Sequence, residues 1–299
     1  ARAARRHGLA RTIVAIDASA DVIARAEALG IADVTTRDLV TGVSGADCVI
    51  LCVPVGANAQ VAALIGPHLK PGAIVSDVGS VKGAVVRDVA AHLPAGVHFI
   101  PAHPVAGTEY SGPDAGFATL FENRWLVLTP PPDQDPDAIA TVQRFWEALG
   151  SNVEIMSAQH HDLVLAITSH VPHLIAYNLV GTAYDLESVV EQEVIKFSAG
   201  GFRDSTRLAA SDPTMWRDVF LNNKDAVLEM VARFSEDLAA LARMIRWGDG
   251  DGLHDLFTRT RAIRRSIIAS GQDTAAPNFG RADGIAATSG RPGDPPAGQ

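Results

Sequence analysis

The sequence predicts an α/β domain with a parallel sheet, followed by an all-helical domain. Short β-branched runs alternate with amphipathic helical stretches up to about residue 155, which is the pattern of successive βαβ units. Beyond residue 156 strand signals disappear and apolar residues recur at helical spacing. With 299 residues, of which 47% are hydrophobic, the chain can build two cores. We therefore divide it into 1–155, 156–270 and a tail, 271–299, whose Gly-, Ala-, Pro- and Asp-rich composition predicts disorder.

The composition argues against several classes of partner. The formal net charge of -9 gives no general attraction to nucleic acid or anionic lipid, so an anion would have to be bound by a local cluster of basic side chains. No apolar run approaches the roughly 20 residues of a membrane span, and the N-terminal residues do not form a signal peptide. We expect a cytoplasmic protein without nucleic-acid or membrane partners.

The first elements indicate a nucleotide site. An Ala- and Arg-rich segment ending at Gly8 predicts a helix, and the run 12–16 predicts a strand that ends at Asp17. In dinucleotide-binding domains of the Rossmann type, an acidic residue closing the second strand binds the ribose 2′-hydroxyl, about 20 residues after a glycine-rich turn. Counting back from Asp17 passes residue 1, so we expect this sequence to lack the first strand and its glycine turn. The alternative role of Asp17 is an ordinary helix cap or turn.

The α/β alternation continues to the end of the first domain. Gly30 is expected to end a helix begun at Ser19, and the apolar run 48–53 is of the kind buried on both faces of a parallel sheet. That run ends at Pro54, at the carboxyl edge where ligands bind. The other elements expected are a strand at Val34, helices over 58–69, 83–93 and 137–149, and strands over 73–77, 97–100, 125–128 and 153–155.

The two cysteines, Cys48 and Cys52, belong to the apolar run 48–53. Because they lie four residues apart on one extended strand, they cannot easily form a disulfide. We expect two small buried side chains and neither a disulfide nor a metal pair.

Candidate chemistry follows the strand over 97–100. The segment 101–112 is too rich in Pro and Gly to continue that strand, so it predicts a loop carrying His103. A histidine there, with Thr108 and Glu109 five and six residues on, suits proton transfer near neutral pH. The alternative is a turn histidine with ordinary hydrogen bonds.

A second loop is predicted to reach the same edge of the sheet. It follows the strand over 73–77 and contains Ser80 and Lys82. Because successive parallel strands end at one edge, Ser80, Lys82 and His103 together form a site hypothesis.

The second domain is predicted to begin with a long helical region capped by Ser157 and kinked near Pro172. His170 and His173 of this region are three residues apart and could bind a metal, but no third ligand type lies nearby, so we predict no metal site. Apolar residues at helical spacing, from Leu221 onward, predict packing against a second copy of the chain.

A polar segment, 200–207, interrupts the helical stretches and contains two arginines. The guanidinium fork can bind a carboxylate through two parallel hydrogen bonds. Structural ion pairs with neighbouring aspartates are the alternative, and we expect them for Arg203 and Arg217.

Four motifs resemble, in this order, those of the prephenate dehydrogenases. They are Asp77-x-Gly-Ser80-x-Lys82; His103-Pro-Val-Ala-Gly-Thr108-Glu109-x-Ser-Gly112; Ser169-His-Val-Pro-His173; and Gly201-Phe-Arg-Asp-Ser-Thr-Arg207, followed by Asp212-Pro-Thr-Met-Trp216. The resemblance runs from residue 1 to about residue 270. It implies an NAD-dependent oxidative decarboxylation of prephenate to 4-hydroxyphenylpyruvate in tyrosine biosynthesis, by a Rossmann domain joined to a helical dimerisation domain in a homodimer.

The resemblance also implies roles for single residues. His103 would hydrogen-bond the ring hydroxyl of the substrate, Ser80 would assist it beside the nicotinamide, and Arg207 would bind a substrate carboxylate. The residues implied to line the pocket are His173, Thr108, Glu109 and Trp216, with Gly200 reaching in from the other subunit. The residues expected to contact NAD are Asp17, Pro54 and Ser80.

Two alternatives remain at this point. The substrate could be arogenate, or both compounds, because no residue identified in the sequence separates a keto from an amino side chain. The chain could also be a non-catalytic, dimer-forming fragment, which the expected lack of the glycine turn favours.

Overall fold

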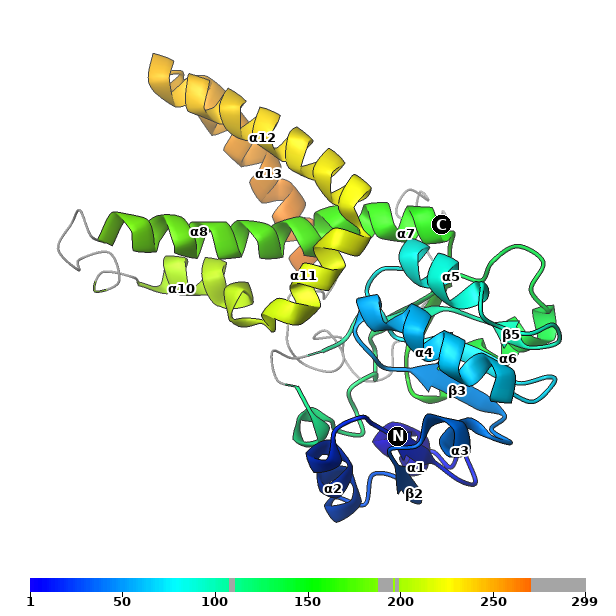
Figure 1. The fold of residues 1–299 in the computed structure, drawn as a ribbon. Coiled ribbons are helices and arrows are strands. Elements are labelled where there is room, and N and C mark those ends of the chain that lie inside the picture. Colours follow the sequence, from blue (N-terminus) through cyan, green and yellow to red (C-terminus); the bar gives the residue numbers. More distant parts are fainter. Residues whose placement is uncertain (108–110, 188–195, 197–198, 270–299) are drawn as a thin grey trace, which may run out of the picture.

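The computed structural model describes residues 1–107, 111–187, 196 and 199–269. Figure 1 shows an α/β part, which holds every described strand, and a helical part whose long helices extend away from it. The predicted order, an α/β domain followed by an all-helical one, is confirmed. The predicted disordered tail, 271–299, lies outside the described residues.

The α/β part contains short helices and strands in alternation. In chain order they are α1 (Arg2–Arg6), β1 (Val14–Ile16), α2 (Ala20–Ala28), β2 (Val34–Thr36), α3 (Leu39–Val43), β3 (Cys48–Leu51), the 3₁₀ turn η1 (Val55–Ala57), α4 (Asn58–Ile65), η2 (Gly66–His68), β4 (Ile74–Asp77), α5 (Gly83–Ala90), β5 (His98–Phe99), β6 (Ala102–Pro104), η3 (Pro113–Ala115), β7 (Trp125–Leu128), α6 (Pro136–Ala148) and β8 (Asn152–Ile155).

The helical part follows directly. It consists of α7 (Ala158–Leu165), the π-helical turn η4 (Ala166–His170), α8 (Val171–Glu187), α10 (Gly200–Thr206), the 3₁₀ turn η5 (Arg207–Ala210), α11 (Pro213–Asn222), α12 (Lys224–Trp247) and α13 (Gly250–Ala269). The predicted cap is confirmed, since the side chain of Ser157 accepts a hydrogen bond from the His160 backbone N–H.

The strands pair as β1-β2, β3-β4-β5 and β6-β7-β8, and all of these pairs are parallel except β6-β7. Leu51 at the end of β3 lies beside Asp77 at the end of β4. The loops after β3 and β4 therefore leave the sheet at one edge, which is where the candidate site lies.

His103 lies in a strand, so the predicted loop was wrong. β6 runs antiparallel to β7 and places His103 opposite Val127. The adjoining backbone hydrogen bonds are donated by Val105 and Thr129, so the strand does not need the N–H group that Pro104 lacks. Proline is tolerated at the edge of a sheet for this reason, and β6 is such an edge.

The core and the cysteines differ in their burial. Buried apolar residues gather around β3, β4, α4 and α5, and Trp216 and Val219 of α11 belong to the same cluster. Of β3, however, only Leu51 is buried, because β3 is the edge of its sheet. The expected burial of Cys48 and Cys52 was therefore wrong, since both are free and exposed.

One helical run, Ala158–Leu186, is long and apolar enough to cross a membrane by length and composition alone, although we expected no such run from the sequence. The core helix of a globular protein passes the same test. The first turns of this run carry His161 and Asp162, which are buried against the α/β part. This burial is typical of a helix that packs against another part of its own chain.

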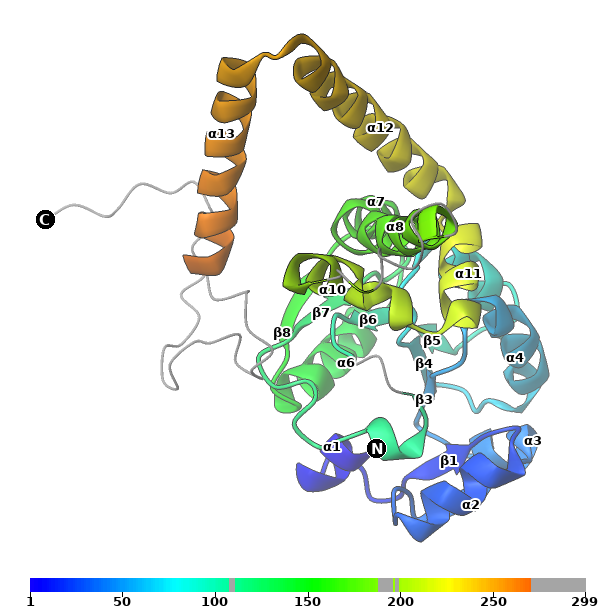
Figure 2. The ribbon, with the colours of Figure 1, turned by 90° about the vertical axis from the view of Figure 1, so that its left-hand side faces the viewer.

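The last two helices present uncovered apolar surface. In Figure 2, α12 and α13 diverge from their shared turn and stand apart from the α/β part. No residue of α13 is buried. Large exposed apolar side chains line both helices: Phe234, Leu238, Ile245 and Trp247 on α12, and Phe257, Ile263, Ile267 and Ile268 on α13.

Candidate active site

A buried ion pair ties the end of β4 to β6. The ammonium group of Lys82 contacts the carboxylate of Asp77, and both side chains are wholly buried. Lys82 Nζ also donates to the Ala102 carbonyl (2.7 Å), and Asp77 Oδ1 accepts from the Ala102 N–H (3.2 Å). Burial lowers the pKa of Lys82, and the charge of Asp77 opposes this shift. Because Ala102 precedes His103, the pair fixes the backbone from which His103 extends.

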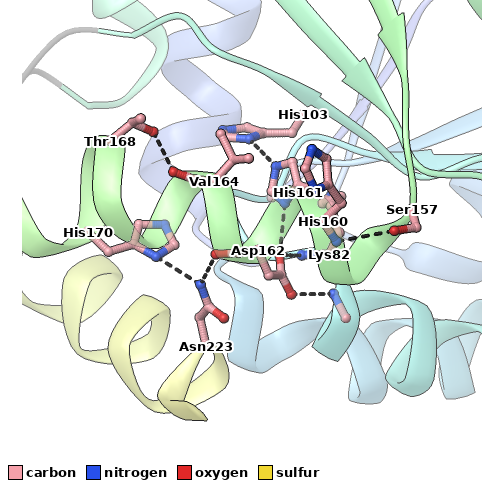
Figure 3. A network of polar contacts seen from close by, with 12 residues as sticks. Lys82, His103, Ser157, His160, His161, Asp162, Val164, Thr168, His170 and Asn223 are labelled. Atoms are coloured by element: carbon pink, nitrogen blue, oxygen red, sulfur yellow. Dashed lines mark hydrogen bonds and ion pairs between the residues drawn. The ribbon is translucent and has the colours of Figure 1, made fainter. Parts of the chain in front are cut away.

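Figure 3 shows that His103 is the first member of a chain of hydrogen-bonded side chains, which we call the histidine chain: His103, His161 and Asp162. The Nδ1 atom of His103 lies 2.8 Å from Nε2 of His161. The Nδ1 atom of His161 lies 2.8 Å from Oδ1 of Asp162. The chain thus runs from β6 into α7 of the helical part.

Asp162, the last member of the histidine chain, accepts hydrogen bonds from two backbone N–H groups. Its Oδ1 accepts from Lys82 N and its Oδ2 from Gly83 N, each at 2.8 Å. A Cβ atom on Gly83 would lie 2.9 Å from Asp162 Oδ2, so the close approach of this carboxylate requires glycine. The start of α5 is therefore shaped to hold Asp162.

The electrostatic surroundings keep His103 neutral. Burial holds the pKa of His103 well below its ordinary value, and charge on His161, Lys82 and His170 would lower it further. The His103 side chain can therefore accept a proton at neutral pH, which is the requirement for a general base.

A second buried histidine, His170, is held by Asn223. Asn223 Nδ2 donates to Nδ1 of His170 (3.1 Å) and to the Asp162 carbonyl (2.9 Å). Burial lowers the pKa of His170 to about 4, and the negative charge of Asp162 acts in the opposite direction. Asn223 thus connects His170 and α7 to the junction of α11 and α12. Among the described residues, no hydrogen bond joins Ser80 itself to His103.

Three residues implied to bind substrate lie together in the helical part, and we call them the binding cluster: His173, Arg207 and Trp216. The His173 ring stacks on Trp216 with ring centroids 3.5 Å apart and an interplanar angle of 22°. His173 Nδ1 donates to the Ser169 carbonyl (2.8 Å), so its Nε2 can accept. Burial lowers the pKa of His173, and the nearby positive charge of Arg207 adds to this effect, while the bond to Ser169 opposes it.

The neighbouring arginines behave as expected from the sequence. Arg203 pairs with Asp204 and Arg217 pairs with Asp218, which confirms both predicted ion pairs. In the part of the chain that the structure describes, no carboxylate pairs with Arg207, which is exposed. Its guanidinium group is available to an external anion.

The residues expected to contact a nucleotide lie at strand ends. Asp17 follows β1, is exposed, and accepts from the Ser19 N–H through Oδ1 (2.8 Å). Pro54 is exposed and precedes η1, and Ser80 is half-buried in the loop after β4. A ribose hydroxyl could reach the Asp17 carboxylate from solvent, so this chain fits a dinucleotide at that position.

The other candidate residues are placed as follows. Gly200 is exposed at the start of α10, a helix that we did not predict. Thr108 and Glu109 lie outside the described residues. Within residues 1–107, 111–187, 196 and 199–269, no group of three or more His, Cys, Asp or Glu side chains could hold a metal ion.

Sequence reasoning missed the roles of His161, Asp162 and Asp77. Neither His161 nor Asp162 was singled out from the sequence. A signal was nevertheless present, since a His-Asp pair follows the Ser157 cap by one helical turn, where polar side chains can face the preceding domain. The pairing of Asp77 with Lys82 was implicit in the motif Asp77-x-Gly-Ser80-x-Lys82.

Comparison with known proteins adds an independent finding. The family model described as "Prephenate dehydrogenase, nucleotide-binding domain" matches residues 1–155, and "Prephenate dehydrogenase, dimerization domain" matches residues 157–259. The chain is 42% identical to the cyclohexadienyl dehydrogenase of Zymomonas mobilis, over 86% of this chain and 87% of that protein.

Two solved structures resemble most of this chain. The prephenate dehydrogenase of Aquifex aeolicus, solved with hydroxyphenyl propionate and NAD⁺, has a TM-score of 0.84 and 34% identity, covering 89% of this chain and 92% of that one. The arogenate dehydrogenase of Synechocystis has a TM-score of 0.75 and 26% identity, covering 89% and 94%. With both family domains present in order and the same fold in these relatives, the chain belongs to the prephenate dehydrogenase family of oxidoreductases.

Proposed function

We propose that this protein catalyses the NAD-dependent oxidative decarboxylation of prephenate to 4-hydroxyphenylpyruvate, a step of tyrosine biosynthesis. The observation that carries the proposal is the neutral, buried His103 at the edge where the ends of β3 and β4 also lie. Residues 1–155, which carry this base, match a nucleotide-binding domain. That combination suits removal of a hydride and a proton from one carbinol group.

The reaction asks His103 to take up one proton and to return it. Taking a hydride from the carbon that bears the hydroxyl requires the hydroxyl proton to leave, and His103 accepts it. Loss of the ring carboxylate as carbon dioxide leaves its electron pair in the ring, which becomes an aromatic phenolate. The phenolate oxygen takes the proton back from His103 and gives 4-hydroxyphenylpyruvate. Because aromatisation drives this loss, the protein needs no electron sink of its own, and its tasks are positioning and charge placement.

NAD is the cofactor in this proposal, and when bound it accepts the hydride. Asp17 holds the ribose hydroxyls, and Pro54 and Ser80 line the edge beside the nicotinamide. The support is the match of residues 1–155 to a nucleotide-binding domain and the exposed Asp17 carboxylate after β1.

The binding cluster orients the substrate. Arg207 binds a carboxylate, His173 offers Nε2 as an acceptor, and Trp216 holds the His173 ring by stacking. We assign the side-chain carboxylate of prephenate to Arg207, because a firm grip on the ring carboxylate would oppose its loss. Thr108, Glu109 and Gly200 complete the pocket in this proposal.

The protein acts as a homodimer in the cytoplasm. The support for a dimer is the exposed apolar surface of α12 and α13 together with the match to a dimerization domain. Gly200, exposed at the start of α10, would reach into the partner's pocket. We also keep the domain division between residues 155 and 156.

Use of arogenate, alone or beside prephenate, is the second candidate. Its support is the naming of the relatives, which include a cyclohexadienyl dehydrogenase and an arogenate dehydrogenase. Parallel assays of NADH formation with prephenate and arogenate discriminate the two. A kcat/KM at least tenfold higher for prephenate supports the main proposal, and the reverse ratio overturns it. Turnover of neither compound would reject the activity altogether.

A further inference from the structure

We propose that His161 and Asp162 are positioning residues that hold His103 in one tautomer, with the proton on Nδ1 and the free electron pair on Nε2. This inference rests on the proposed function, in which His103 accepts the hydroxyl proton. It adds which nitrogen accepts that proton and which residues decide it. Two of the three members of the histidine chain lie on α7, outside the nucleotide-binding domain that carries His103.

The argument begins at Asp162. An ionised carboxylate can only accept hydrogen bonds. Both oxygens of Asp162 already receive backbone N–H donors, from Lys82 and from Gly83, so both oxygens act as acceptors. The remaining partner, Nδ1 of His161, must therefore carry a proton and donate it to Oδ1 at 2.8 Å.

The proton position on His161 then determines the direction of the next hydrogen bond in the histidine chain. A neutral imidazole has one N–H donor and one acceptor nitrogen. Because Nδ1 of His161 donates, its Nε2 accepts, and the atom 2.8 Å away, Nδ1 of His103, must donate. Neutral His103 then has its electron pair on Nε2. With both rings neutral, a reversal at either link would place two donors or two acceptors face to face.

Burial makes this arrangement rigid. His161 is 0% exposed and His103 8% exposed, so water cannot replace the missing partner if a ring turns over. Among the described residues, the charged or titratable groups that face His103 are His161 from α7, His170 from η4 and Lys82 from the loop before α5, with Asp77 paired to Lys82. Of these, His161 is the one that hydrogen-bonds the His103 ring.

The tautomer can be measured without substrate. In protein labelled with ¹⁵N-histidine, two-bond ¹H–¹⁵N correlation spectra distinguish protonated from unprotonated ring nitrogens, and the His103→Asn spectrum assigns the His103 signals. We expect His103 and His161 both to carry the proton on Nδ1 at pH 7.5. A wild-type spectrum with the His103 proton on Nε2 overturns the proposal, whatever the enzyme is found to catalyse.

Two substitutions at position 161 separate positioning from packing. His161→Gln retains an oxygen that can accept from His103 Nδ1, whereas His161→Leu fills the space without an acceptor. We expect His161→Leu to lower kcat on the order of 10²-fold with little change in KM, since loss of the orienting partner leaves a base in the wrong tautomer. His161→Gln should recover most of kcat and the wild-type His103 signal.

The matched control is His160→Leu, because His160 neighbours His161 on α7 but is exposed. It should leave kcat, KM and the His103 signals unchanged. Equal kcat losses in the Leu and Gln variants at position 161, with the His103 tautomer unmoved in both, would assign His161 a packing role and overturn the inference. If neither prephenate nor arogenate is turned over by wild type, the proposed function fails, but the tautomer result stands by itself.

Discussion

The histidine chain and the binding cluster are built in opposite ways. His103, His161 and Asp162 are buried, and each hydrogen-bonds its neighbours within the chain. Arg207 is exposed and faces no carboxylate among the described residues, while His173 presents a free Nε2. Under the proposed function, the difference teaches that the group that moves a proton is oriented in advance by the fold, whereas the groups assigned to substrate binding are left for the substrate to complete.

The sharpest way to break this comparison is His103→Asn. A positioned base typically contributes about 10²–10⁴-fold, so kcat should fall by that order while substrate affinity falls modestly. The lowered pKa of His103 places the acidic limb of the wild-type kcat profile below pH 6.5, because the base is lost only when the ring is protonated. The mutant should lack this limb. Steady-state kinetics between pH 4.5 and 9 measure both effects.

The control for this substitution is His160→Asn. His170 is unsuitable as a control, because it is buried and hydrogen-bonded to Asn223, which also donates to the Asp162 carbonyl. Near-normal kcat with an intact acidic limb in His103→Asn would mean that the histidine chain is only structural.

Arg207→Ala tests the binding cluster. Removing a charge-assisted fork should cost about 2–4 kcal/mol of substrate binding, so KM should rise far more than kcat falls. Arg203→Ala is the matched control, since its guanidinium group already pairs with Asp204 at the surface. A loss of NAD affinity with an unchanged KM for prephenate would remove Arg207 from the binding cluster.

The burial of His170 should make the free energy of unfolding depend on pH. Burial lowers the pKa of His170 from 6.5 to about 4. Between these values, His170 is protonated in the unfolded chain but not in the folded chain. The free energy of unfolding should therefore fall as the pH drops from 6.5 towards 4, with His170 alone contributing on the order of 2–3 kcal/mol. Urea unfolding across this range measures the slope. His170→Gln, which cannot titrate, should flatten it, and an unchanged slope would contradict the assignment.

The smallest effect is expected at the exposed cofactor edge. The Asp17 carboxylate should accept from a ribose hydroxyl and repel a 2′-phosphate, so NAD should be preferred over NADP. Asp17→Ser should narrow the ratio of kcat/KM for the two cofactors on the order of tenfold, without changing KM for prephenate. Equal use of both cofactors by the wild type would show that Asp17 is only a turn residue.

Several helices and their ends were predicted from the sequence because their signals are local, whereas the short helices α3 and α10 were not. The cap at Ser157 and the glycine stop at Gly30 each depend on a few neighbouring residues, and both appear in the structure. The strand at β6 was missed, since its formation depends on pairing with β7 some twenty residues later. Burial of Cys48 was overestimated because periodicity does not reveal which strand lies at an edge.

The site was only partly predicted from the sequence, because some of its contacts join residues that lie far apart in the chain. His103, Ser80 and Arg207 stand in recognisable motifs. His161 was visible in the sequence, but its contact with His103 joins residues 58 positions apart, across two domains, and only the packing of α7 on β6 brings it about. Local sequence patterns identify which side chains can take part in the chemistry, but they do not identify which of these side chains are in contact in the folded protein.

The π-helical turn η4 gives the site an unusual vulnerability. It joins α7 to α8 and contains one residue more per turn than an α-helix needs. If the same residues formed a regular α-helix, everything that follows would be rotated by about 100° relative to α7. His173 would then face away from Trp216 while Asp162 kept its place. The wide turn at η4 therefore decides which face of α8 meets Trp216, and a substitution that closes η4 into an α-helix should separate His173 from Trp216.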